Sequence, residues 1–437
     1  MNHLKTLHSR VDSRAATVGI IGLGHVGLPL VLRFCQEGFN VVGFDIDDAK
    51  VASLNKGESY IQDVPSESLA GFVGIKFSAT ADFNKLSNMD VIIICVPTPL
   101  TNKKDPDLRY IISTTEEIAK RLRAGQLISL ESSTYPGNTE EELLPRFESK
   151  GLKVGKDFFL VYSPERVDPG NKQFKIKNIP KIVGGVTPNC LSIGKAVYEK
   201  VVEKVVTVSS PKVAEMAKLL ENIYRSVNIA LVNELKVLCD RMDINIWEVI
   251  EAASTKPFGF VPFYPGPGLG GHCIPVDPFY LSWKAREYNI PTRFIELAGE
   301  INTSMPHWVI DKVIDALNER GKTLKGSKIL ILGVTYKKDV ADMRESPALK
   351  LIELLSERDA IVTYNDPYIR SMPKLRKYDF RMDSQELTSE LLKSVDAVII
   401  AADHGCYDFD FIVSNANLVI DTRNAIKNPM DGKVIKA

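Results

Sequence analysis

The sequence predicts an α/β protein in which two doubly wound parallel sheets are joined by a long helix and a small helical central domain. Apolar runs of strand length alternate with helical patterns in the first part of the chain and again in the last part, which is typical of parallel sheets covered by helices on both faces. Between them, roughly 30 residues carry apolar side chains at helical spacing. We expect a flexible extension over residues 1–16 and three domains over residues 17–208, 209–318 and 319–437.

The composition is that of an ordinary globular protein. Of 437 residues, 55 are basic, 55 are acidic and 44% are hydrophobic, and the zero net charge argues against a nucleic-acid-binding surface. The longest apolar runs, such as residues 91–96, are far shorter than the ~20 residues that span a bilayer. The N-terminal residues lack the apolar centre of a secretory signal, so we expect a frayed extension, no membrane contact and a cytoplasmic location.

The cysteines and histidines give no sign of a disulfide framework or a metal site. The six cysteines are scattered at positions 35, 95, 190, 239, 273 and 406, without the paired spacing that either would need. The six histidines show no ligand spacing. We therefore expect thiols and no metal.

A glycine turn closes the first expected strand. Residues 17–22 read as a buried strand, residues 28–37 as a helix and residues 40–45 as a strand that ends in Asp45. A strand, a glycine turn, a helix and an acid about 20 residues later are typical of a dinucleotide-binding, Rossmann-like domain. The alternative is a glycine turn without a ligand. The turn residues that we expect to hold a pyrophosphate are Gly22, Leu23, Gly24, His25, Val26 and Gly27.

Asp45 indicates which dinucleotide binds. Its carboxylate can accept hydrogen bonds from ribose hydroxyls, and Asp47 and Asp48 add negative charge where a 2′-phosphate would need an arginine. The sequence therefore favours NAD over NADP.

Polar turns follow two further expected strands of this domain. Thr98 follows residues 91–96, and Thr134 follows residues 126–130. Because ligands bind outside the carboxyl ends of parallel strands, both threonines should face the cofactor. The alternative is that they serve only the turns.

The C-terminal third repeats the order of strands and helices, which predicts a second Rossmann-like domain. Thr335, Tyr336, Lys337 and Lys338 stand where the second and third glycines would be, so we expect a ligand other than a dinucleotide. The expected elements are strands over residues 328–333, 361–366, 396–401 and 417–421 and a helix over residues 348–355.

A long helix is expected between the two domains. Ser209 and Ser210 can cap it, Pro211 suits its first position, and the apolar pattern runs from Val213 to Leu238. Such a helix would be about 45 Å long. It is apolar on several faces, so we expect it to be buried between elements or between the subunits of a homodimer or larger homo-oligomer.

The stretch from Tyr264 to Pro278 is a shaped loop with four glycines and four prolines, and it carries Cys273. Most cysteines behave as small core residues, but a thiol in such a loop can be reactive if its surroundings are accessible and electropositive. A reactive thiol and an ordinary loop residue both remain open.

Two further polar features have a functional and an ordinary interpretation. Lys218 and Asn222 lie four residues apart and so project from one face of the long helix. The lysine is either a base or an oxyanion partner, or part of an exposed stripe. Glu165, in the turn after the expected strand at residues 158–161, is a base or a turn residue.

Together these segments resemble the UDP-glucose/GDP-mannose dehydrogenase family. The similarity runs from about residue 17 to the C-terminus and rests on GLGHVG, CVPTP, SST, SPERVDPGN, AEMAKLLENIYRSVN, PGPGLGGHCIPVDP, GVTYKKDVADMRESPA and VIDTRN, in this order. SPER in place of NPEF, GGHC in place of GGSC, and residues 256–260 are similar to the bacterial UDP-N-acetylglucosamine 6-dehydrogenases.

The resemblance implies that C6 of a UDP-linked sugar is oxidised twice by NAD, from alcohol to carboxylate. Cys273 would carry a thiohemiacetal and then a thioester. Lys218 and Asn222 would stabilise the oxyanion, and Lys218 would share proton transfer with a water held by Asp277 or Thr134.

The same resemblance assigns further contacts. Glu165 would assist thioester hydrolysis, Arg344 would contact the cofactor, and Lys337 and Arg423 would contact the nucleotide sugar. Arg166 replaces an aromatic residue of the glucose branch and could donate to an acetamido carbonyl. The expected sugar pocket comprises Glu165, Arg166, Lys218, Asn222, Tyr264, Gly268 and Gly270.

We therefore expect oxidation of UDP-N-acetylglucosamine for a surface-polysaccharide precursor, with UDP-N-acetylmannosamine or UDP-glucose as alternative substrates. Two departures from the family pattern are His25, where the family has tyrosine, and the substrate arginine of the glucose branch, for which Lys256 is the nearest candidate. The competing hypotheses are a single-step hydroxyacid dehydrogenase and a non-catalytic NAD-binding protein.

Overall fold

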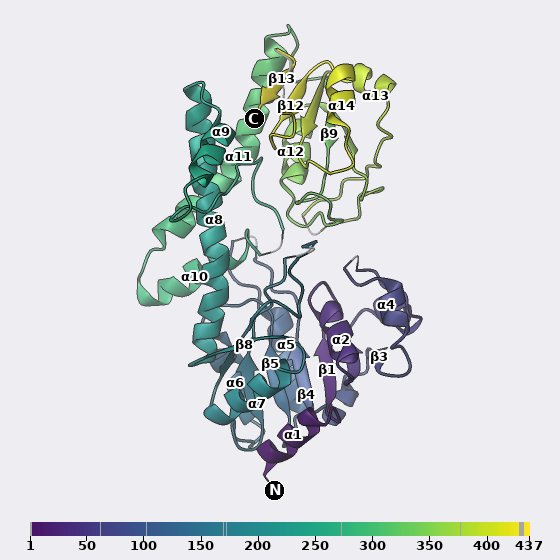
Figure 1. The fold of residues 1–437 in the computed structure, drawn as a ribbon, viewed down its shortest axis with the longest axis vertical. Coiled ribbons are helices and arrows are strands. Elements are labelled where there is room, and N and C mark those ends of the chain that lie inside the picture. The colour runs from purple at the N-terminus through teal and green to yellow at the C-terminus, as the bar shows by residue number, and fades with distance from the viewer. Residues whose placement is uncertain are drawn as a thin grey trace. The chain divides into compact units, whose positions relative to one another are not determined.

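The computed structural model describes residues 2–61, 63–101, 103–168, 170–171, 173–271, 273–375, 377–427 and 432–437, so Pro169 and His272 of the quoted motifs lie outside the described residues. The chain divides into two compact units, Met1–Glu221 with Phe279–Ile290 and Asn222–Pro278 with Pro291–Ala437 (Figure 1). The predicted domain boundaries remain a prediction.

The first unit is built on an eight-stranded sheet with the order β3-β2-β1-β4-β5-β6-β7-β8. Neighbouring strands are parallel except β6 and β7, which pair antiparallel. The strands are β1 (Thr17–Ile21), β2 (Asn40–Phe44), β3 (Phe77–Thr80), β4 (Val91–Ile94), β5 (Leu127–Leu130), β6 (Phe159–Tyr162), β7 (Lys181–Gly185) and β8 (Val205–Val208).

Side chains that alternate along these strands fill separate cores on the two faces of the sheet. Ile93 lies in the core that also holds Val18 and Ile20, whereas Ile92 and Ile94 lie in the other core, as the two-residue repeat of a strand requires. The helical elements of this unit are α1 (His3–Asp12), α2 (Gly27–Gln36), α3 (Asp48–Asn55), α4 (Ser66–Ala70), η1 (Phe83–Asn88), α5 (Arg109–Arg121), η2 (Thr139–Leu143), α6 (Leu144–Glu148), α7 (Pro188–Tyr198) and η3 (Arg286–Tyr288).

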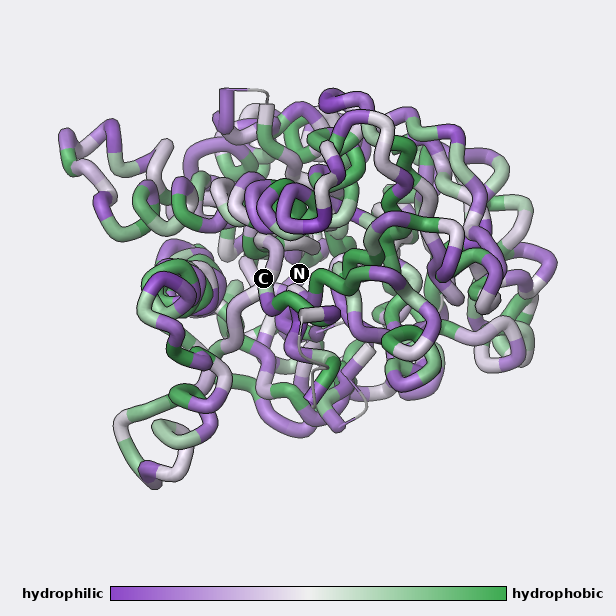
Figure 2. The backbone as a smooth tube through the Cα atoms, turned by 90° about the horizontal axis from the view of Figure 1, so that it is seen from above, coloured by the Kyte–Doolittle hydropathy of each residue, from purple (hydrophilic) through white to green (hydrophobic). Residues whose placement is uncertain are grey.

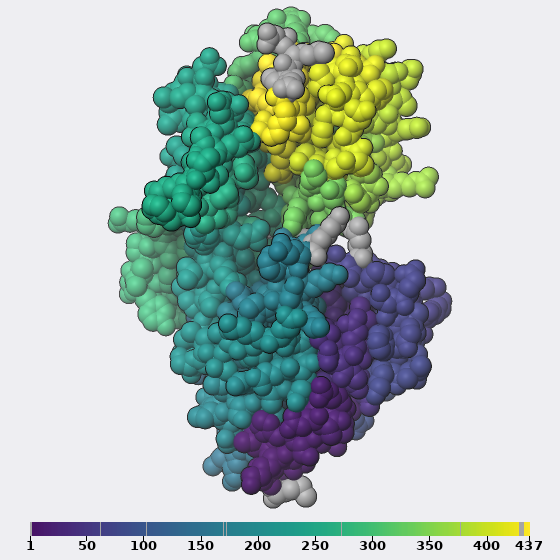
Figure 3. All heavy atoms as spheres, in the orientation of Figure 1, coloured from purple at the N-terminus to yellow at the C-terminus, as the bar shows by residue number. Residues whose placement is uncertain are grey.

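The N-terminal residues differ from the frayed extension that the sequence suggested. They form α1, whose Leu7 and Val11 are buried in the core of the first unit, and its atoms lie against the rest of that unit in Figure 3. The Asn2 side chain caps the helix by accepting from the Lys5 N–H, and Asp12 pairs with Lys200 at 2.7 Å. Leu4, Leu7 and Val11 recur at helical spacing, a signal too short to stand out in the sequence.

The second unit contains a five-stranded parallel sheet with the order β10-β9-β11-β12-β13. Ile329 and Ile331 face one core and Leu330 and Leu332 the other. The elements of this unit are α9 (Ile246–Ser254), α11 (Arg293–Asn318), β9 (Lys328–Leu332), α12 (Pro347–Ser356), β10 (Ile361–Asn365), α13 (Ser389–Ser394), β11 (Ala397–Ile400), α14 (Phe409–Asn415), β12 (Val419–Asp421) and β13 (Val434–Lys436). The predicted fold class, with two doubly wound sheets and a helical central region, is confirmed.

The predicted long helix is α8 (Pro211–Arg241), which begins in the first unit and continues into the second. Helix α10 (Asp277–Ala285) also crosses the division between the units. Figure 2 shows hydrophilic and hydrophobic residues alternating along the backbone, as expected of elements that bury one face. Among the described residues, no helix combines the length and apolar character needed to span a bilayer.

Candidate active site

The glycine turn between β1 and α2 has the geometry of a phosphate-binding turn. Gly22 has φ +92°, and a Cβ there would lie 2.6 Å from the Cys95 carbonyl oxygen. A Cβ on Gly27 would lie 1.9 Å from the Gly22 carbonyl oxygen, whereas Gly24 has open space around it. Side chains are therefore excluded at Gly22 and Gly27, where the turn packs. At Gly24 the missing side chain leaves room for a ligand to approach the protein backbone.

Helix α2 starts directly after this turn. Val26 occupies the N-cap position and no side chain caps the first amides. His25 precedes it in the turn. Uncapped N–H groups at the start of a helix form an anion site, so the turn can hold a pyrophosphate.

Asp45 follows β2 and is only half-buried. Its Oδ2 accepts from the Leu23 N–H at 3.0 Å, and its Oδ1 accepts from the Asp47 N–H at 3.0 Å. The Tyr60 hydroxyl donates to the Leu23 carbonyl at 2.6 Å. Asp45 thus holds the glycine turn as well as presenting a carboxylate, and Tyr60, which sequence reasoning missed, steadies the same turn.

The two threonines after β4 and β5 are both buried. The Thr98 carbonyl accepts from the Tyr280 hydroxyl at 3.1 Å. The Thr134 side chain is fully buried, and its hydroxyl has no hydrogen-bond partner among the described residues. An orphaned buried hydroxyl indicates a partner such as a ligand or water.

The loop after Thr134 is anchored by a buried carboxylate. Glu215 of α8 accepts from the Gly137 N–H at 2.5 Å and from the Thr139 N–H and hydroxyl at 3.0 and 2.7 Å. Burial raises the pKa of Glu215 to about 7, and these hydrogen bonds oppose the rise.

These observations fit NAD in the first unit. The open space at Gly24, the uncapped start of α2, the half-buried Asp45 and the orphaned Thr134 hydroxyl supply a phosphate site, a ribose acceptor and a polar contact.

Glu165 belongs to a buried cluster that the sequence did not reveal. Lys181 Nζ lies 2.6 Å from Glu131 Oε2 and 3.2 Å from Glu165 Oε2. Glu165 Oε1 accepts from the N–H groups of Arg166 and Val167, both at 2.7 Å. Burial alone would raise the pKa of Glu165, but Lys181 and the two N–H groups hold it below its ordinary value. Glu165 is therefore an ionised carboxylate that accepts from three donors and keeps one acceptor position.

Arg166 has partners within the first unit. Its Nε and Nη2 donate to the two carboxylate oxygens of Glu221 at 3.2 and 2.5 Å, and its Nη1 donates to the Pro180 carbonyl at 2.7 Å. Arg166 and Glu221 line, with Phe174 and Ile179, a hollow of about 290 Å³.

The long helix presents Lys218 and Asn222 one turn apart, and both are buried, with 8% and 4% of their surface exposed. Asn222 Nδ2 donates to Asp277 Oδ2 at 2.6 Å. Asp277 begins α10 and is fully buried. The exposed-stripe interpretation of Lys218 and Asn222 is therefore wrong.

Cys273 lies at the head of the turn that leads into α10. Its carbonyl accepts from the N–H groups of Val276 and Asp277 at 3.1 and 2.8 Å, and its side chain is half-buried. Arg344 is close enough to interact electrostatically with the thiol, although Asp342 is the main partner of Arg344. A nearby cation favours a thiolate.

The cysteine loop is held from several sides within the second unit. The Gly266 N–H donates to Asn233 Oδ1 at 3.0 Å, and the Gly271 N–H donates to the Arg344 carbonyl at 3.0 Å. Gly270 packs so closely on Tyr336 that a Cβ would lie 2.5 Å from the tyrosine Cβ.

The remaining predicted residues also lie in the second unit. Gly268 has φ +130° and Tyr264 is 52% exposed. Lys337 is half-buried in the loop after β9. Arg423 Nε donates to the Ala401 carbonyl at 2.8 Å.

The guanidinium of Arg423 reaches the cysteine loop, where a Cβ on Gly266 would lie 2.5 Å from its Nη1. Burial lowers the pKa of Arg423, and Asp403 and Asp421 oppose this effect. Arg423 forms no ion pair within the described ranges, so it can receive an anionic ligand.

Three matches to family models cover most of the chain. They are the NAD binding domain of the UDP-glucose/GDP-mannose dehydrogenase family at residues 16–202, its central domain at residues 212–304 and its UDP binding domain at residues 330–428.

Individual relatives agree with this assignment. A UDP-N-acetyl-D-glucosamine 6-dehydrogenase of Pseudomonas aeruginosa is 36% identical, covering 83% of this chain and 85% of the relative. A UDP-N-acetyl-D-mannosamine dehydrogenase of Escherichia coli (strain K12) is 34% identical, covering 89% of this chain and 94% of the relative. A solved UDP-D-ManNAc dehydrogenase from Pyrococcus horikoshii matches with a TM-score of 0.87 at 31% identity, covering 96% of this chain and 98% of that chain.

The relatives share the nucleotide-sugar class and differ in the sugar that their names give. The chain belongs to the UDP-glucose/GDP-mannose dehydrogenase family and is an oxidoreductase with NAD as its cofactor.

Proposed function

We propose that the protein oxidises C6 of UDP-N-acetyl-D-glucosamine in two steps, from alcohol to carboxylate, in a pathway to surface polysaccharide. The observation that carries this proposal is that Cys273 heads the turn into α10, whose first residue, Asp277, forms a buried pair with Asn222. A shielded carboxylate and amide in the same turn as a cysteine suit acyl chemistry at sulfur.

The proposed chemistry is a relay through the Cys273 sulfur. NAD, when bound, takes up two electrons and one hydrogen from C6 in each oxidation. After the first oxidation, Cys273 Sγ adds to the aldehyde carbon and forms a thiohemiacetal, and the second oxidation gives a thioester. Water then adds to the thioester carbonyl, the carbon–sulfur bond breaks, and the thiol and the carboxylate are released.

We propose that Lys218 and Asn222 stabilise the negative charge that develops on the C6 oxygen. This charge develops when the alcohol loses its proton and again when sulfur or water adds to the carbonyl. The Lys218 ammonium and the Asn222 amide can donate to that oxygen. The hydrogen bond to Asp277 fixes the Asn222 amide, and a water at Asp277 or Thr134 can accept the proton.

Glu165 takes a narrower role than the sequence suggested. A carboxylate with a lowered pKa that already accepts from Lys181 and two N–H groups is a weak base near neutral pH. We propose that Glu165 orients the attacking water instead of removing its proton.

Arg166 supports the choice of an N-acetylated sugar. Three of its five N–H groups donate to Glu221 and Pro180. Two N–H groups remain, enough to donate to an acetamido carbonyl in the hollow that Arg166 lines. A glucose hydroxyl would satisfy these donors less well.

The test compares kcat/KM for UDP-N-acetylglucosamine, UDP-N-acetylmannosamine and UDP-glucose from NADH absorbance, with the product identified by mass spectrometry. We expect UDP-N-acetylglucosamine to be preferred, with two NADH per sugar. Equal or better values for either competitor overturn the sugar assignment, and one NADH per sugar overturns the two-step chemistry. Cys273→Ala should abolish acid formation and keep UDP-sugar binding, whereas the exposed Cys406→Ala should remain active.

We further propose that the protein is a homodimer built on α8. Exposed apolar side chains recur along this helix at spacings of three, four and seven residues, a stripe that suits the same stripe of a second copy. Light scattering should give a dimer, and Leu231→Glu with Leu238→Glu should give a monomer. A wild-type monomer would contradict the proposal. The stripe comprises Val213, Met216, Leu220, Tyr224, Leu231, Leu235 and Leu238.

A further inference from the structure

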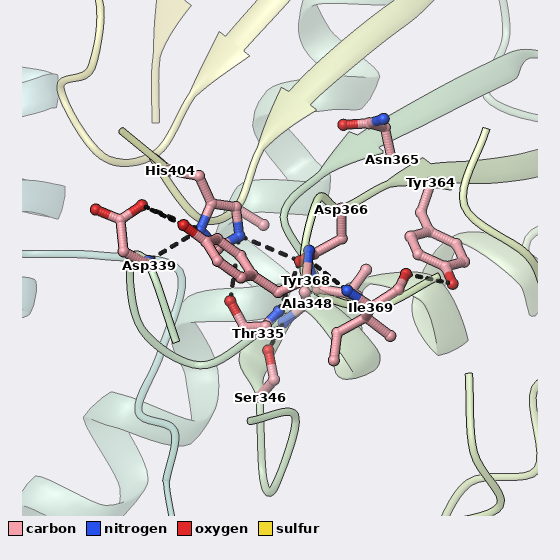
Figure 4. Close-up of polar contacts among 12 residues, drawn as sticks. Thr335, Asp339, Ser346, Ala348, Tyr364, Asn365, Asp366, Tyr368, Ile369 and His404 are labelled. Atoms are coloured by element: carbon pink, nitrogen blue, oxygen red, sulfur yellow. Dashed lines mark hydrogen bonds and ion pairs between the residues drawn. The ribbon is translucent and has the colours of Figure 1, made fainter. Parts of the chain in front are cut away.

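His404 follows β11 and is completely buried in the second unit. Its Nδ1 lies 3.0 Å from the backbone nitrogen of Asp339, and its Nε2 lies 3.2 Å from Asp366 Oδ2 (Figure 4). Because a backbone N–H can only donate, Nδ1 must be the acceptor. The neutral ring then carries its hydrogen on Nε2 and donates it to Asp366.

Asp366 is a fixed acceptor for this hydrogen. Its Oδ2 also accepts from the N–H groups of Val334 and Thr335 at 2.7 and 3.3 Å, and its Oδ1 accepts from those of Tyr368 and Ile369 at 2.8 and 3.1 Å. Burial alone would raise the pKa of Asp366, but His404 and the N–H groups lower it. Asp366 therefore stays ionised and selects one tautomer of the ring.

Asp366 directly follows β10 as Asp45 directly follows β2, but the two acids have different surroundings. Asp45 is half-buried and accepts only from two backbone N–H groups in the contacts described. Asp366 is 3% exposed and is covered by His404. The donor that Asp45 could find in a ribose hydroxyl is thus supplied to Asp366 by an internal imidazole.

His404 holds the loop after β9 at two points, Thr335 and Asp339. The Thr335 hydroxyl lies 3.3 Å from Nε2 and donates to the Lys337 carbonyl at 3.0 Å. Asp339 has φ +59°, a left-handed conformation that is unfavourable for a residue with a side chain. Its carboxylate accepts from the Gly405 N–H at 2.7 Å. The surroundings must therefore impose the path of this loop.

The same loop supports the cysteine loop. Tyr336 is the surface on which Gly270 and Gly271 pack, since a Cβ on them would lie 2.5 and 3.0 Å from tyrosine atoms. Gly271 is two residues before Cys273. A shift of residues 335–339 would therefore move Lys337 and the approach to the Cys273 thiol together.

We propose that His404 is a positioning residue: its ring, oriented by Asp366, sets the path of residues 335–339 and thereby places Lys337 for the nucleotide sugar and supports the Cys273 loop. The Lys337 part rests on the proposed function. The Cys273 part can be tested without any substrate.

The hydrogen bonds at the two ring nitrogens can be separated by substitution. His404→Asn keeps an oxygen near Nδ1 for the Asp339 N–H, His404→Gln keeps a donor near Nε2 for Asp366, and His404→Phe keeps the ring volume and removes both. His307→Asn, at an exposed histidine of α11, is the matched control. All are made with Cys406→Ser, because Cys406 is an exposed thiol near His404.

Two readouts are measured for each variant: the Kd for UDP by calorimetry, and the rate at which iodoacetamide alkylates Cys273, followed by peptide mass spectrometry. We expect His404→Phe to weaken UDP binding roughly tenfold, the effect of losing one or two hydrogen bonds that fix a binding loop. The alkylation rate should change several-fold, and the KM for NAD should stay within about twofold. His404→Asn should recover most of both effects and His404→Gln less.

Unchanged Kd and alkylation rate in His404→Phe would overturn the proposal, as would an Asn variant no better than the Gln variant. If His404→Phe shows no cooperative thermal transition, His404→Asn and His404→Gln are compared instead. An Asn variant no better than the Gln variant again overturns the proposal. Failure of the proposed function has a different signature, namely no NADH from the unsubstituted enzyme with any of the three UDP-sugars.

Discussion

Replacing Lys181 by methionine should test the buried charge cluster of the first unit. Lys181 begins β7 and its side chain is 5% exposed, between Glu131, which is completely buried, and Glu165, which is 15% exposed. Burial alone would lower the pKa of Lys181, but the two carboxylates raise it. Methionine keeps most of the side-chain volume and removes the charge.

The expected loss of stability follows from the two carboxylates that remain after the lysine is removed. The two carboxylates would lose their shared cation, and breaking a buried ion pair in this way costs about 3–5 kcal/mol. Glu131 keeps the Tyr198 hydroxyl at 2.6 Å, and burial already raises its pKa. Protonation of Glu131 therefore limits the loss, and we expect about 3 kcal/mol near pH 7.

The assay is differential scanning calorimetry with urea unfolding as a second measurement. For a unit of this size, 3 kcal/mol corresponds to a fall in Tm of roughly 6–12 °C. Lys195→Met is the matched control, because Lys195 and Glu199 are 3.6 Å apart and each is 49% exposed. Such a pair contributes about 1 kcal/mol or less. Adding Glu131→Gln to Lys181→Met should recover part of the stability.

A loss below about 1 kcal/mol in Lys181→Met, or a loss equal to that of Lys195→Met, would refute the reasoning. It would mean that water or protonation compensates both carboxylates without the lysine. The description of Glu165 as a carboxylate with a lowered pKa would then fall as well.

Three further predictions concern single sites. Lys218→Ala should lower kcat roughly 10²- to 10³-fold with little change in KM, since a cation at a developing oxyanion acts mainly in the transition state; initial rates check this, and a change in KM alone would make Lys218 a binding group. Asp45→Ala with Ile46→Arg should shift the preference toward NADP, with a lower affinity for both dinucleotides because Asp45 also holds the Leu23 N–H; an unchanged NAD/NADP ratio of kcat/KM would leave Asp45 only a turn residue. Lys236→Met should raise the free energy of unfolding by about 1–2 kcal/mol at pH 7. Burial between two tryptophan rings disfavours the charged lysine and lowers the pKa of Lys236 to about 8, whereas cation–π contacts offset part of this cost of burial. Between pH 8 and about 10.4 the unfolded chain binds more protons at this lysine, so wild-type stability should rise with pH there, and urea unfolding of the variant should show that rise reduced; an equal rise in both proteins would exclude Lys236 as its source.

The elements that depend on local sequence pattern could be predicted from the sequence. The glycine turn, the acid that ends β2 and the apolar runs of both sheets are readable because strand period and backbone conformation are properties of neighbouring residues. The 31-residue helix α8 and the loop around Cys273 were readable for the same reason. Helix α1 was missed because its pattern is short.

Contacts between distant parts of the chain were decided only by the tertiary structure. Lys181 lies 50 residues from Glu131 along the chain, and His404 lies 38 residues from Asp366. A lone lysine at the start of a strand or a histidine after one has no local signal, because its ionisation and orientation depend on which groups burial brings to it. Arg166 is the clearest case: its residue type suggested a ligand contact, and packing added Glu221 and Pro180 as partners. Local pattern thus determines where chemistry-bearing residues lie along the chain, whereas long-range packing determines which of their donors, acceptors and charges remain for a ligand.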